Sequence, residues 1–255
     1  MSLHCEVAGS GPDLVLLHGW GMNAGIWSGV VRELAPHFRV HAVDLPGYGA
    51  SAACEPYTLE HLAQRLAQRL PSPCLVCGWS LGGQLALTWA GARPQQVRRL
   101  ALIATTPCFV RRDGWTHAVE AGVLRAFAQA LTTDYAGTLR RFVALQAQGD
   151  DRARQVIAQL RQTLFARGEP ASRVLTQGLD ILLGTDLRAQ LAAIAQPALV
   201  LHGECDALVP SAAGAHLGRM LPRARFVGMP GAAHAPFASD PMATSALLKR
   251  FFDER

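Results

Sequence analysis

The fold of this chain is decided by residues 74–90, which read CLVCGWSLGGQLALTWA. An apolar run predicts a buried strand, the pentapeptide G-x-S-x-G at 78–82 follows, and a helical pattern begins at once. This order is typical of a nucleophile elbow, with Ser80 at the tip of a strained turn. Gly78 and Gly82 flank the turn because a Cβ atom there would collide with the adjoining strand or helix. A glycine-rich turn with an incidental serine is the alternative, but the flanking strand and helix favour a nucleophile.

Strands and helices alternate on both sides of this stretch. Apolar runs predict strands, and apolar residues at helical spacing predict the helices between them. Besides the elbow strand and its helix, we expect strands at 13–18, 39–43, 97–104, 198–201 and 224–227, and helices at 26–34, 59–70 and 241–252. The alternation predicts an α/β fold with a mostly parallel central sheet and helices on both faces.

The alternation stops between residues 108 and 187, where only helical patterns are found. They cover 121–131, 138–148, 152–167 and 172–183. We therefore expect an α/β core made of residues 1–107 and 188–255, and an inserted all-helical lid at 108–187. Open α/β sheets bind ligands at the carboxyl ends of their strands, so the lid is expected over that edge.

A serine hydroxyl is a weak nucleophile and needs a base, which in turn needs an orienting acid. His234, in GAAHAPF after the last expected strand, is the candidate base. Asp206, in HGECD after the preceding strand, is the candidate acid. Glu204 is its rival, but an acid in the pattern G-x-x-D after a strand is the usual placement in this architecture. His18 and His202 close strands, and we expect them to orient loops through hydrogen bonds.

Two backbone N–H groups are needed to stabilise an oxyanion beside Ser80. Leu81, directly after the nucleophile, is expected to supply one. Trp20, in HGWG after the first apolar strand, is expected to supply the other. Its indole would also form a wall of the acyl site, although a purely structural aromatic is the alternative.

Several classes of site and partner are not expected. No His, Cys or acidic spacing is typical of a metal site, so we expect neither metal nor cofactor. Cys74 and Cys77 spell C-x-x-C, but they lie in a strand and are expected to be buried thiols. The start of the chain shows no signal peptide, and no apolar run reaches the length of a membrane span. We expect a cytoplasmic monomer without nucleic-acid or membrane partners.

The charge is unevenly placed. The formal net charge is +5, and Lys249 is the only lysine among 24 basic residues. Between residues 108 and 173, arginines outnumber acidic residues. The expected lid is therefore moderately basic.

Five motifs follow one another along the chain: HGWG, DLPGYG-x-S, GWSLGG, G-x-x-D and AAHAPF. In this order they resemble the α/β-hydrolase superfamily over the whole chain. HGWGMN, GWSLGG and AAHAPF, together with RFVALQ at 141–146 and GLDIL at 178–182, resemble more closely the pimeloyl-[acyl-carrier protein] methyl ester esterases. The resemblance implies an α/β-hydrolase fold and a serine carboxylesterase of biotin synthesis that hydrolyses this ester to methanol and the free acid.

The same resemblance assigns roles to residues. It implies a triad of Ser80, Asp206 and His234, and oxyanion donors at Trp20 and Leu81. It also implies that Trp20, Ser80, Leu81 and His234 contact the substrate, and that the substrate channel is lined by Phe142, Val143, Ala144, Leu145 and Gln146.

The resemblance also implies that acyl carrier protein docks on arginines of the lid. Arg141 and Arg154 match docking positions, and Arg161 lies nearby. Arg154 and Arg161 are seven residues apart and so share one helix face, where guanidinium groups suit carboxylates and phosphate. Gly137 and Ala158 depart from the pattern, because further basic residues are expected there. The alternative is that these arginines only solvate exposed helices.

Two other classes of function stay open at this point. One is a broad short-chain carboxylesterase or a carbon–carbon bond hydrolase of the same fold. The other is a ligand-binding receptor or scaffold that has no enzymatic activity. An intact triad favours an enzyme, since a scaffold does not need all three groups.

Overall fold

The computed structural model describes residues 2–166 and 171–254. Its centre is one sheet in the strand order β1-β3-β2-β4-β5-β6-β7, in which all neighbours are parallel except β1 and β3. The strands are β1 (Cys5–Ala8), β2 (Asp13–Leu17), β3 (Arg39–Val43), β4 (Cys74–Trp79), β5 (Val97–Ile103), β6 (Ala198–Gly203) and β7 (Ala224–Met229). The prediction of a mostly parallel α/β sheet is confirmed.

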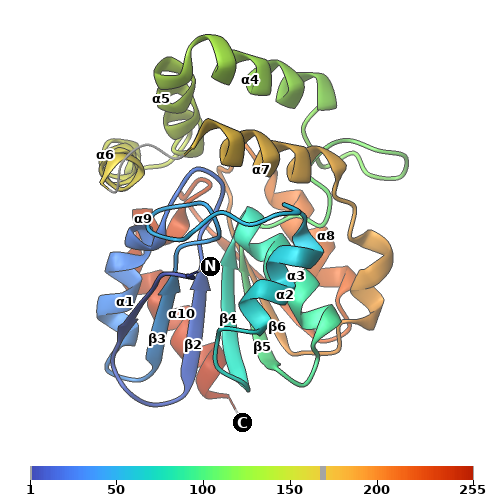
Figure 1. Ribbon diagram of the computed structural model, residues 1–255. Helices are drawn as coiled ribbons and strands as arrows, with labels where there is room; N and C mark the ends of the chain where they lie inside the picture. The colour runs from blue at the N-terminus through green and yellow to red at the C-terminus, as the bar shows by residue number, and fades with distance from the viewer. Residues whose placement is uncertain (1, 167–170, 255) are drawn as a thin grey trace.

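Helices cover both faces of this sheet. Helices α2 and α3 pack together on one face, and α1 and α10 pack together on the other (Figure 1). The helices that precede or follow the strands of the core are η1 (Ala24–Trp27), α1 (Ser28–Leu34), α2 (Leu59–Ala67), α3 (Leu81–Ala92), η2 (Arg188–Ala193), α8 (Ser211–Met220), α9 (Pro236–Ser239) and α10 (Pro241–Asp253).

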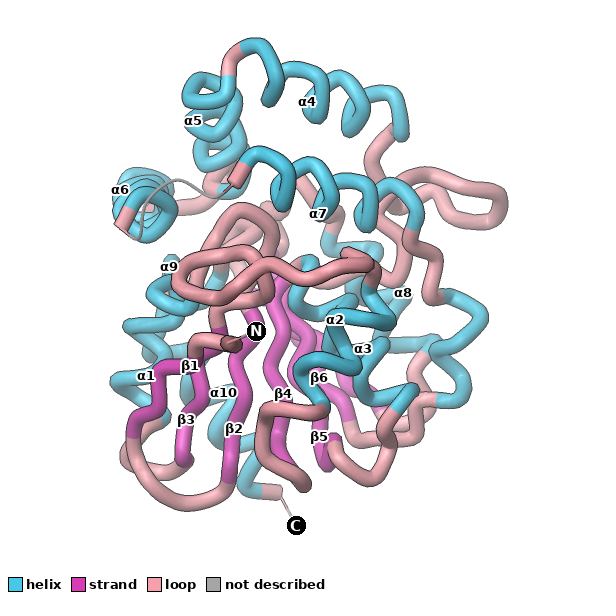
Figure 2. The backbone as a smooth tube through the Cα atoms, viewed as in Figure 1, coloured by secondary structure: helices cyan, strands magenta, loops and turns pink. Residues whose placement is uncertain are grey.

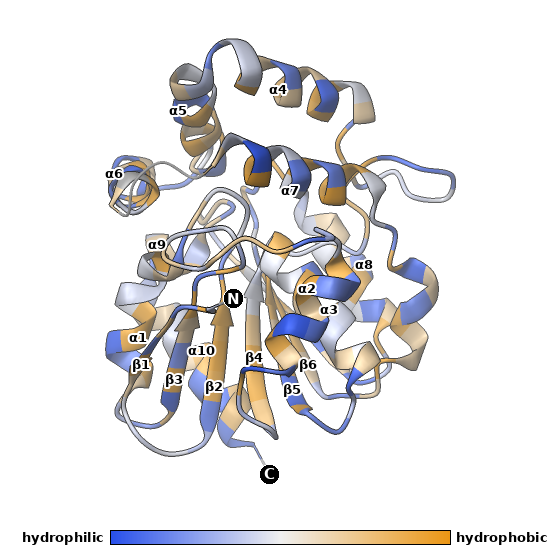
Figure 3. Cartoon of the chain, in the orientation of Figure 1, coloured by the Kyte–Doolittle hydropathy of each residue, from blue (hydrophilic) through white to orange (hydrophobic). Residues whose placement is uncertain are grey.

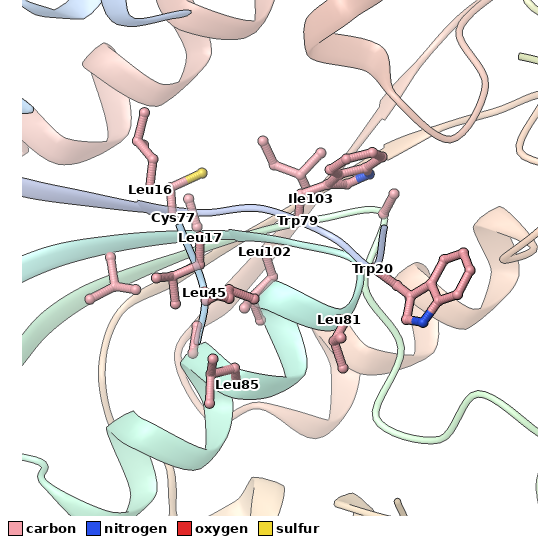
Figure 4. Close-up of a cluster of buried hydrophobic side chains, with 14 of the residues drawn as sticks. Leu16, Leu17, Trp20, Leu45, Cys77, Trp79, Leu81, Leu85, Leu102 and Ile103 are labelled. Carbon is pink, nitrogen blue, oxygen red and sulfur yellow. The ribbon is translucent and has the colours of Figure 1, made fainter. Parts of the chain in front are cut away.

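The central strands lie in the buried core because their sequences are apolar. Every residue of β4 is buried, and so are four of the five residues of β2. In Figure 3 most of both strands is coloured as hydrophobic. Cys77 lies opposite Leu16 of β2, and both belong to the buried cluster of Figure 4. Cys74 and Cys77 are buried thiols, and burial raises the pKa of both.

In the part of the chain that the structure describes, four α-helices and then η2 lie between β5 and β6, and we call the four α-helices the helical insertion. They are α4 (Ala121–Thr133), α5 (Tyr135–Gln146), α6 (Ala153–Phe165) and α7 (Ser172–Gly184). The insertion lies beyond the carboxyl ends of the strands (Figure 1), and loops lie between the sheet and α7 (Figure 2). The helix expected at 152–167 ends at Phe165, and Arg167 lies outside the described residues.

Some expectations were wrong. Residues 108–120 are not helical: they form a loop in which bridges join Val110 to Val119 and Arg112 to Trp115. The loop's Phe109 and Trp115 are buried, so tertiary packing gives this segment its shape. Strand β1 and helix α8 were missed. The first is a short, largely exposed edge strand, and the second consists mainly of small residues that produce little hydrophobic periodicity.

None of the helices in residues 2–166 and 171–254 combines the length and the apolar composition needed to cross a bilayer.

Candidate active site

Ser80 lies between the end of β4 and the start of α3, in a backbone conformation that is costly for a residue with a side chain. Its φ of 54° and ψ of −117° place it in a sparsely populated region. A Cβ atom on Gly78 would collide with the carbonyl group of Gly82, and one on Gly82 would collide with the carbonyl group of Leu17. The small residues of G-x-S-x-G are therefore required by close backbone packing.

Backbone hydrogen bonds hold this turn in place. The Ser80 N–H donates to Ile103 O at 2.9 Å, and the Gly83 N–H donates to Ser80 O at 2.9 Å. Leu81 is the first residue of α3, so its N–H has no acceptor within the helix. The positive end of the helix dipole therefore faces the space beside Ser80.

The structure brings His234 and Asp206 together from two loops. His234 lies between β7 and α9, and Asp206 lies between β6 and α8. His234 Nδ1 lies 2.7 Å from Asp206 Oδ2, and both side chains are fully or almost fully buried. The rival acid Glu204 is exposed. Since the Asp206 contact occupies Nδ1, Nε2 is the nitrogen of His234 that remains for a serine proton.

Four donors surround the Asp206 carboxylate. Oδ1 accepts the N–H groups of Leu208 at 2.9 Å and Val209 at 2.8 Å. Oδ2 accepts from His234, and His202 Nε2 lies 3.2 Å from the same oxygen. Burial alone would raise the pKa of Asp206, but the two histidines lower it well below its usual range. The carboxylate therefore stays ionised.

His202 orients a loop, as the sequence predicted, and it also faces the acid. Its Nε2 lies 2.9 Å from Val209 O as well as near Asp206, so Nε2 carries the proton. The buried Nδ1 has no hydrogen-bond partner among the residues that the structure describes. The contact with Asp206 was missed from sequence, because the pattern H-G-x-x-D does not show how tightly the chain turns.

The loop after β2 reaches the elbow. A Cβ atom on Gly19 would lie only 3.3 Å from Ser80 Cβ. His18 Nδ1 lies 2.8 Å from Gly19 O, and His18 Nε2 accepts the Leu45 N–H at 3.0 Å. His18 therefore holds the carbonyl of the Gly19–Trp20 peptide, so the Trp20 N–H points to the opposite side of that trans peptide. Burial lowers the pKa of His18 to about 4, which keeps the ring neutral.

Trp20 is buried beside the helical insertion. Its Nε1 donates to Leu175 O of α7 at 2.8 Å, and its ring packs edge-on against Phe142 and Phe127. Figure 4 shows Trp20 and Leu81 beyond the ends of the central strands. A Cβ atom on Gly178 would lie 2.7 Å from Trp20 Cδ1, so a glycine of α7 makes room for the indole.

An apolar cavity of about 250 Å³ opens between these groups and the insertion. It extends from Trp20 and Leu208 to Val123 and Leu145, which are exposed. Its lining is Trp20, Phe109, Val119, Val123, Leu124, Phe127, Phe142, Leu145, Leu179, Leu182, Ala207 and Leu208. This lining suits an alkyl chain. A larger groove of about 470 Å³ between α2 and α7 is more polar. Neither lining includes Ser80, Asp206 or His234, but the apolar cavity includes Trp20 and the two residues that follow Asp206, Ala207 and Leu208.

The expected channel residues do not all line this cavity. Phe142 and Leu145 do, whereas Val143 is buried elsewhere, Ala144 is exposed, and Gln146 is buried with its carbonyl bonded to the His234 N–H. Residues three apart share a helix face, but five consecutive ones cannot. The cavity residues of α4 and α7 were missed, although the i, i+3 spacing of Leu179 and Leu182 was a usable signal.

The expected docking arginines lie on the insertion. Arg154 and Arg161 are exposed on α6. Arg141 on α5 is exposed too, but it bonds to Asp134 at 3.2 Å and to the Thr138 hydroxyl at 2.9 Å. Within residues 2–166 and 171–254, no group of three or more His, Cys, Asp or Glu side chains is arranged to hold a metal ion.

Comparison with known proteins agrees with this geometry. The family model described as the alpha/beta hydrolase fold matches residues 12–241. The chain belongs to the α/β-hydrolase family. The esterase EaEST from Exiguobacterium antarcticum superimposes with a TM-score of 0.91 over 99% of this chain and 96% of that one, at 23% identity, which supports the fold alone.

Two curated relatives are more similar in sequence, and both are named pimeloyl-[acyl-carrier protein] methyl ester esterase. The protein from Nitrosomonas europaea is 46% identical over 94% of this chain and 95% of its own length. The protein from Xanthomonas campestris is 45% identical over 98% of both chains.

Proposed function

We propose that this protein is a serine carboxylesterase that hydrolyses the methyl ester of a pimeloyl chain carried on acyl carrier protein, a step of biotin synthesis. The observation that carries the proposal is the match, across nearly the whole chain, to relatives named for this reaction. The contact of 2.7 Å between His234 and Asp206 supports the serine mechanism, as does a serine on a strained elbow whose preceding residue, Trp79, hydrogen-bonds to His234 O.

In the proposed reaction, Ser80 Oγ attacks the ester carbonyl while His234 Nε2 takes its proton. Asp206, held ionised by its four donors, fixes the imidazole orientation and stabilises the imidazolium. The N–H groups of Leu81 and Trp20 stabilise the oxyanion of the tetrahedral intermediate. Methanol leaves with the proton from His234. Water activated by the same histidine then releases the acid from Ser80.

The cavity supports an acyl chain as the substrate. An apolar chain bound there gains about 0.8 kcal/mol for each methylene removed from water. The exposed positions of Val123 and Leu145 mark where the far end of the chain would leave the protein. A carrier protein attached to that end would then lie beside α4 and α5.

We further propose that residues 108–187 act as a lid on the core formed by 1–107 and 188–255, and that the carrier protein docks on it. Arg154 and Arg161 supply exposed positive charge on α6. Arg141 contributes less, because Asp134 already neutralises it. Carrier proteins are acidic and bear a phosphate on their prosthetic arm, so charge attraction would speed encounter and favour the carrier-bound ester.

The test compares hydrolysis of pimeloyl methyl ester on acyl carrier protein with hydrolysis of the same ester without the carrier, at low and high salt. We expect a higher kcat/KM for the carrier-bound ester, and an advantage that shrinks as salt screens the arginines. Equal rates on both esters would contradict the carrier-protein proposal and leave a general esterase. No hydrolysis of any ester would contradict the serine mechanism as well.

A further inference from the structure

The loop that carries His234 is held from two sides. From the core, Trp79 Nε1 donates to His234 O at 2.8 Å, and Asp206 contacts the imidazole. From the other side, the segment that joins α5 to α6 contacts the loop along its length. We call residues 146–152 the α5–α6 junction. It belongs to the helical insertion, far in sequence from the elbow and from both triad loops.

Asp150 is the centre of this second contact. Although it is a carboxylate on a surface loop, it is only 7% exposed. Its Oδ2 accepts the N–H of Ala233 at 2.8 Å, and its Oδ1 accepts the Ser239 hydroxyl at 2.8 Å. Its own segment supplies a third donor, the Arg152 N–H, at 2.8 Å from Oδ1. One side chain thus ties the residue before His234 to the end of α9.

Neighbouring atoms of the junction extend the contact. The His234 N–H donates to Gln146 O at 3.1 Å, and the Asp151 N–H donates to Gly231 O at 2.8 Å. The Arg152 guanidinium donates to Ser239 O at 2.8 Å. The backbone on both sides of the imidazole is therefore fixed by the insertion, while the ring itself is fixed by the core.

We propose that Asp150 is a positioning residue for His234, which rests on the role of His234 as the base in the proposed function. Hydrogen bonds to a carboxylate are stronger than those between neutral groups, and all three donors point at oxygen atoms. An amide at this position would turn an NH2 group toward one of these donors. The loop would then shift, and small displacements of a catalytic group are costly in rate.

The test uses Asp150→Asn, with Asp151→Asn as its matched control. Asp151 is the next residue, and its hydrogen bond to Gly231 O uses only the backbone N–H. Its exposed side chain lies against Gly231, and the asparagine side chain has the same shape. Both variants lose one negative charge from the junction. Sites that react with a fluorophosphonate would be counted first, so that rates refer to folded enzyme. The substrates are a short free ester and the carrier-bound pimeloyl ester.

For Asp150→Asn we expect kcat per titrated site to fall roughly ten- to hundredfold with KM little changed, and equally on both substrates. For Asp151→Asn we expect wild-type kcat. A docking role would instead raise KM on the carrier-bound ester alone. A purely structural role would lower the number of titrated sites and leave kcat per site unchanged. Either of these two outcomes would overturn the proposal.

If Asp150→Asn does not fold, the variant Ser239→Ala tests the positioning role instead. It removes a single donor to Asp150 Oδ1 and leaves the carboxylate in place. We expect a severalfold fall in kcat per site, and wild-type kcat would overturn the proposal. Failure of the wild-type protein to hydrolyse esters would count against the proposed function, not against this positioning role alone.

Discussion

The elbow and the helical insertion meet at the candidate active site, but they are held in place differently. The elbow is fixed by backbone packing: a Cβ atom on Gly78 or Gly82 would collide with a carbonyl group. In the insertion, Gly122 and Gly184 have open space where a Cβ would lie. The two elbow glycines tolerate no added atom, whereas the insertion has room at these two positions and is tight at Gly137 and Gly178, where the neighbouring atoms belong to side chains.

The insertion is joined to the core by side chains that bond to distant backbone groups. Trp20 Nε1 donates to Leu175 O, Asn23 Nδ2 donates to Thr163 O, and Asp150 accepts from Ala233. Each bond contributes on the order of 1 kcal/mol, so the insertion is docked by a few modest contacts and by apolar packing. We therefore expect the rate of ester hydrolysis to depend mainly on the elbow and its partners, and the choice of substrate to depend mainly on the insertion.

The strongest test of the elbow is Ser80→Ala. We expect kcat to fall on the order of 10⁶-fold, because the nucleophile is removed while the oxyanion donors remain. The thermal unfolding midpoint should stay close to that of the wild type, since Ser80 contributes only its hydroxyl. Activity near the wild-type level would remove Ser80 from the mechanism.

The next test concerns the partners of the elbow. Asp206→Asn should lower kcat by about 10⁴-fold, because the amide no longer selects the correct histidine tautomer. Rates on a short ester would be compared with those of Glu204→Gln, which alters the exposed rival acid. Equal losses in the two variants would contradict the assignment of the acid.

Ionisation of Asp206 should also affect how the free energy of unfolding depends on pH. Its pKa is lowered in the folded protein from the ordinary value of 3.8, so the ionised form stabilises the fold above that pH. This contribution is lost as pH falls below 3.8 toward the folded-state pKa. Urea unfolding should therefore show a steeper acid loss of stability in the wild type than in Asp206→Asn. Parallel curves would mean that the pKa is not lowered.

Phe142→Ala tests the cavity on the insertion side. Trp20 loses one of its two edge-on partners and an acyl chain loses apolar contact, so kcat/KM for a long-chain ester should fall about tenfold. The effect on an acetyl ester should be smaller, because that substrate does not reach the aromatic wall. Phe226→Ala, at an exposed aromatic of β7, is the matched control and should behave like the wild type. Equal loss on both esters would contradict a chain-binding role.

The smallest effect is expected at the outer surface of the insertion. Replacing Arg154 and Arg161 together by Ala should raise KM for the carrier-bound ester roughly two- to tenfold, because exposed ionic contacts are individually weak. The KM for the free ester and the thermal midpoint should not change. Arg250→Ala, an exposed arginine of α10, is the control. An unchanged KM in the double variant would indicate that these arginines only solvate the helix.

The sequence predicted well wherever function depends on local backbone geometry. The order strand, G-x-S-x-G, helix is a local rule, and Ser80 is found on the expected turn. Parallel strands share one carboxyl edge, so His234 and Asp206, each following a strand, were expected at the edge where Ser80 lies. Their contact is present at 2.7 Å, although their catalytic roles stay a prediction.

The sequence predicted poorly wherever a site is assembled from helix faces. Residues 142–146 were expected to line one channel, but a helix turns consecutive side chains to different sides, and only Phe142 and Leu145 face the cavity. Residues 108–120 were included in the all-helical lid, yet they form an irregular loop in which Phe109 and Trp115 are buried.

By itself, the sequence determined the sheet, the elbow, the order of the triad candidates and the basic character of the insertion, because all of these follow from local patterns and chain order. Only the tertiary structure decided that Asp206 is shared by two histidines and that Asp150 supports the loop of His234. Hydrogen bonds between residues tens of positions apart leave no periodic signal in a chain. They exist only after the apolar faces have packed and brought the donors and acceptors within reach.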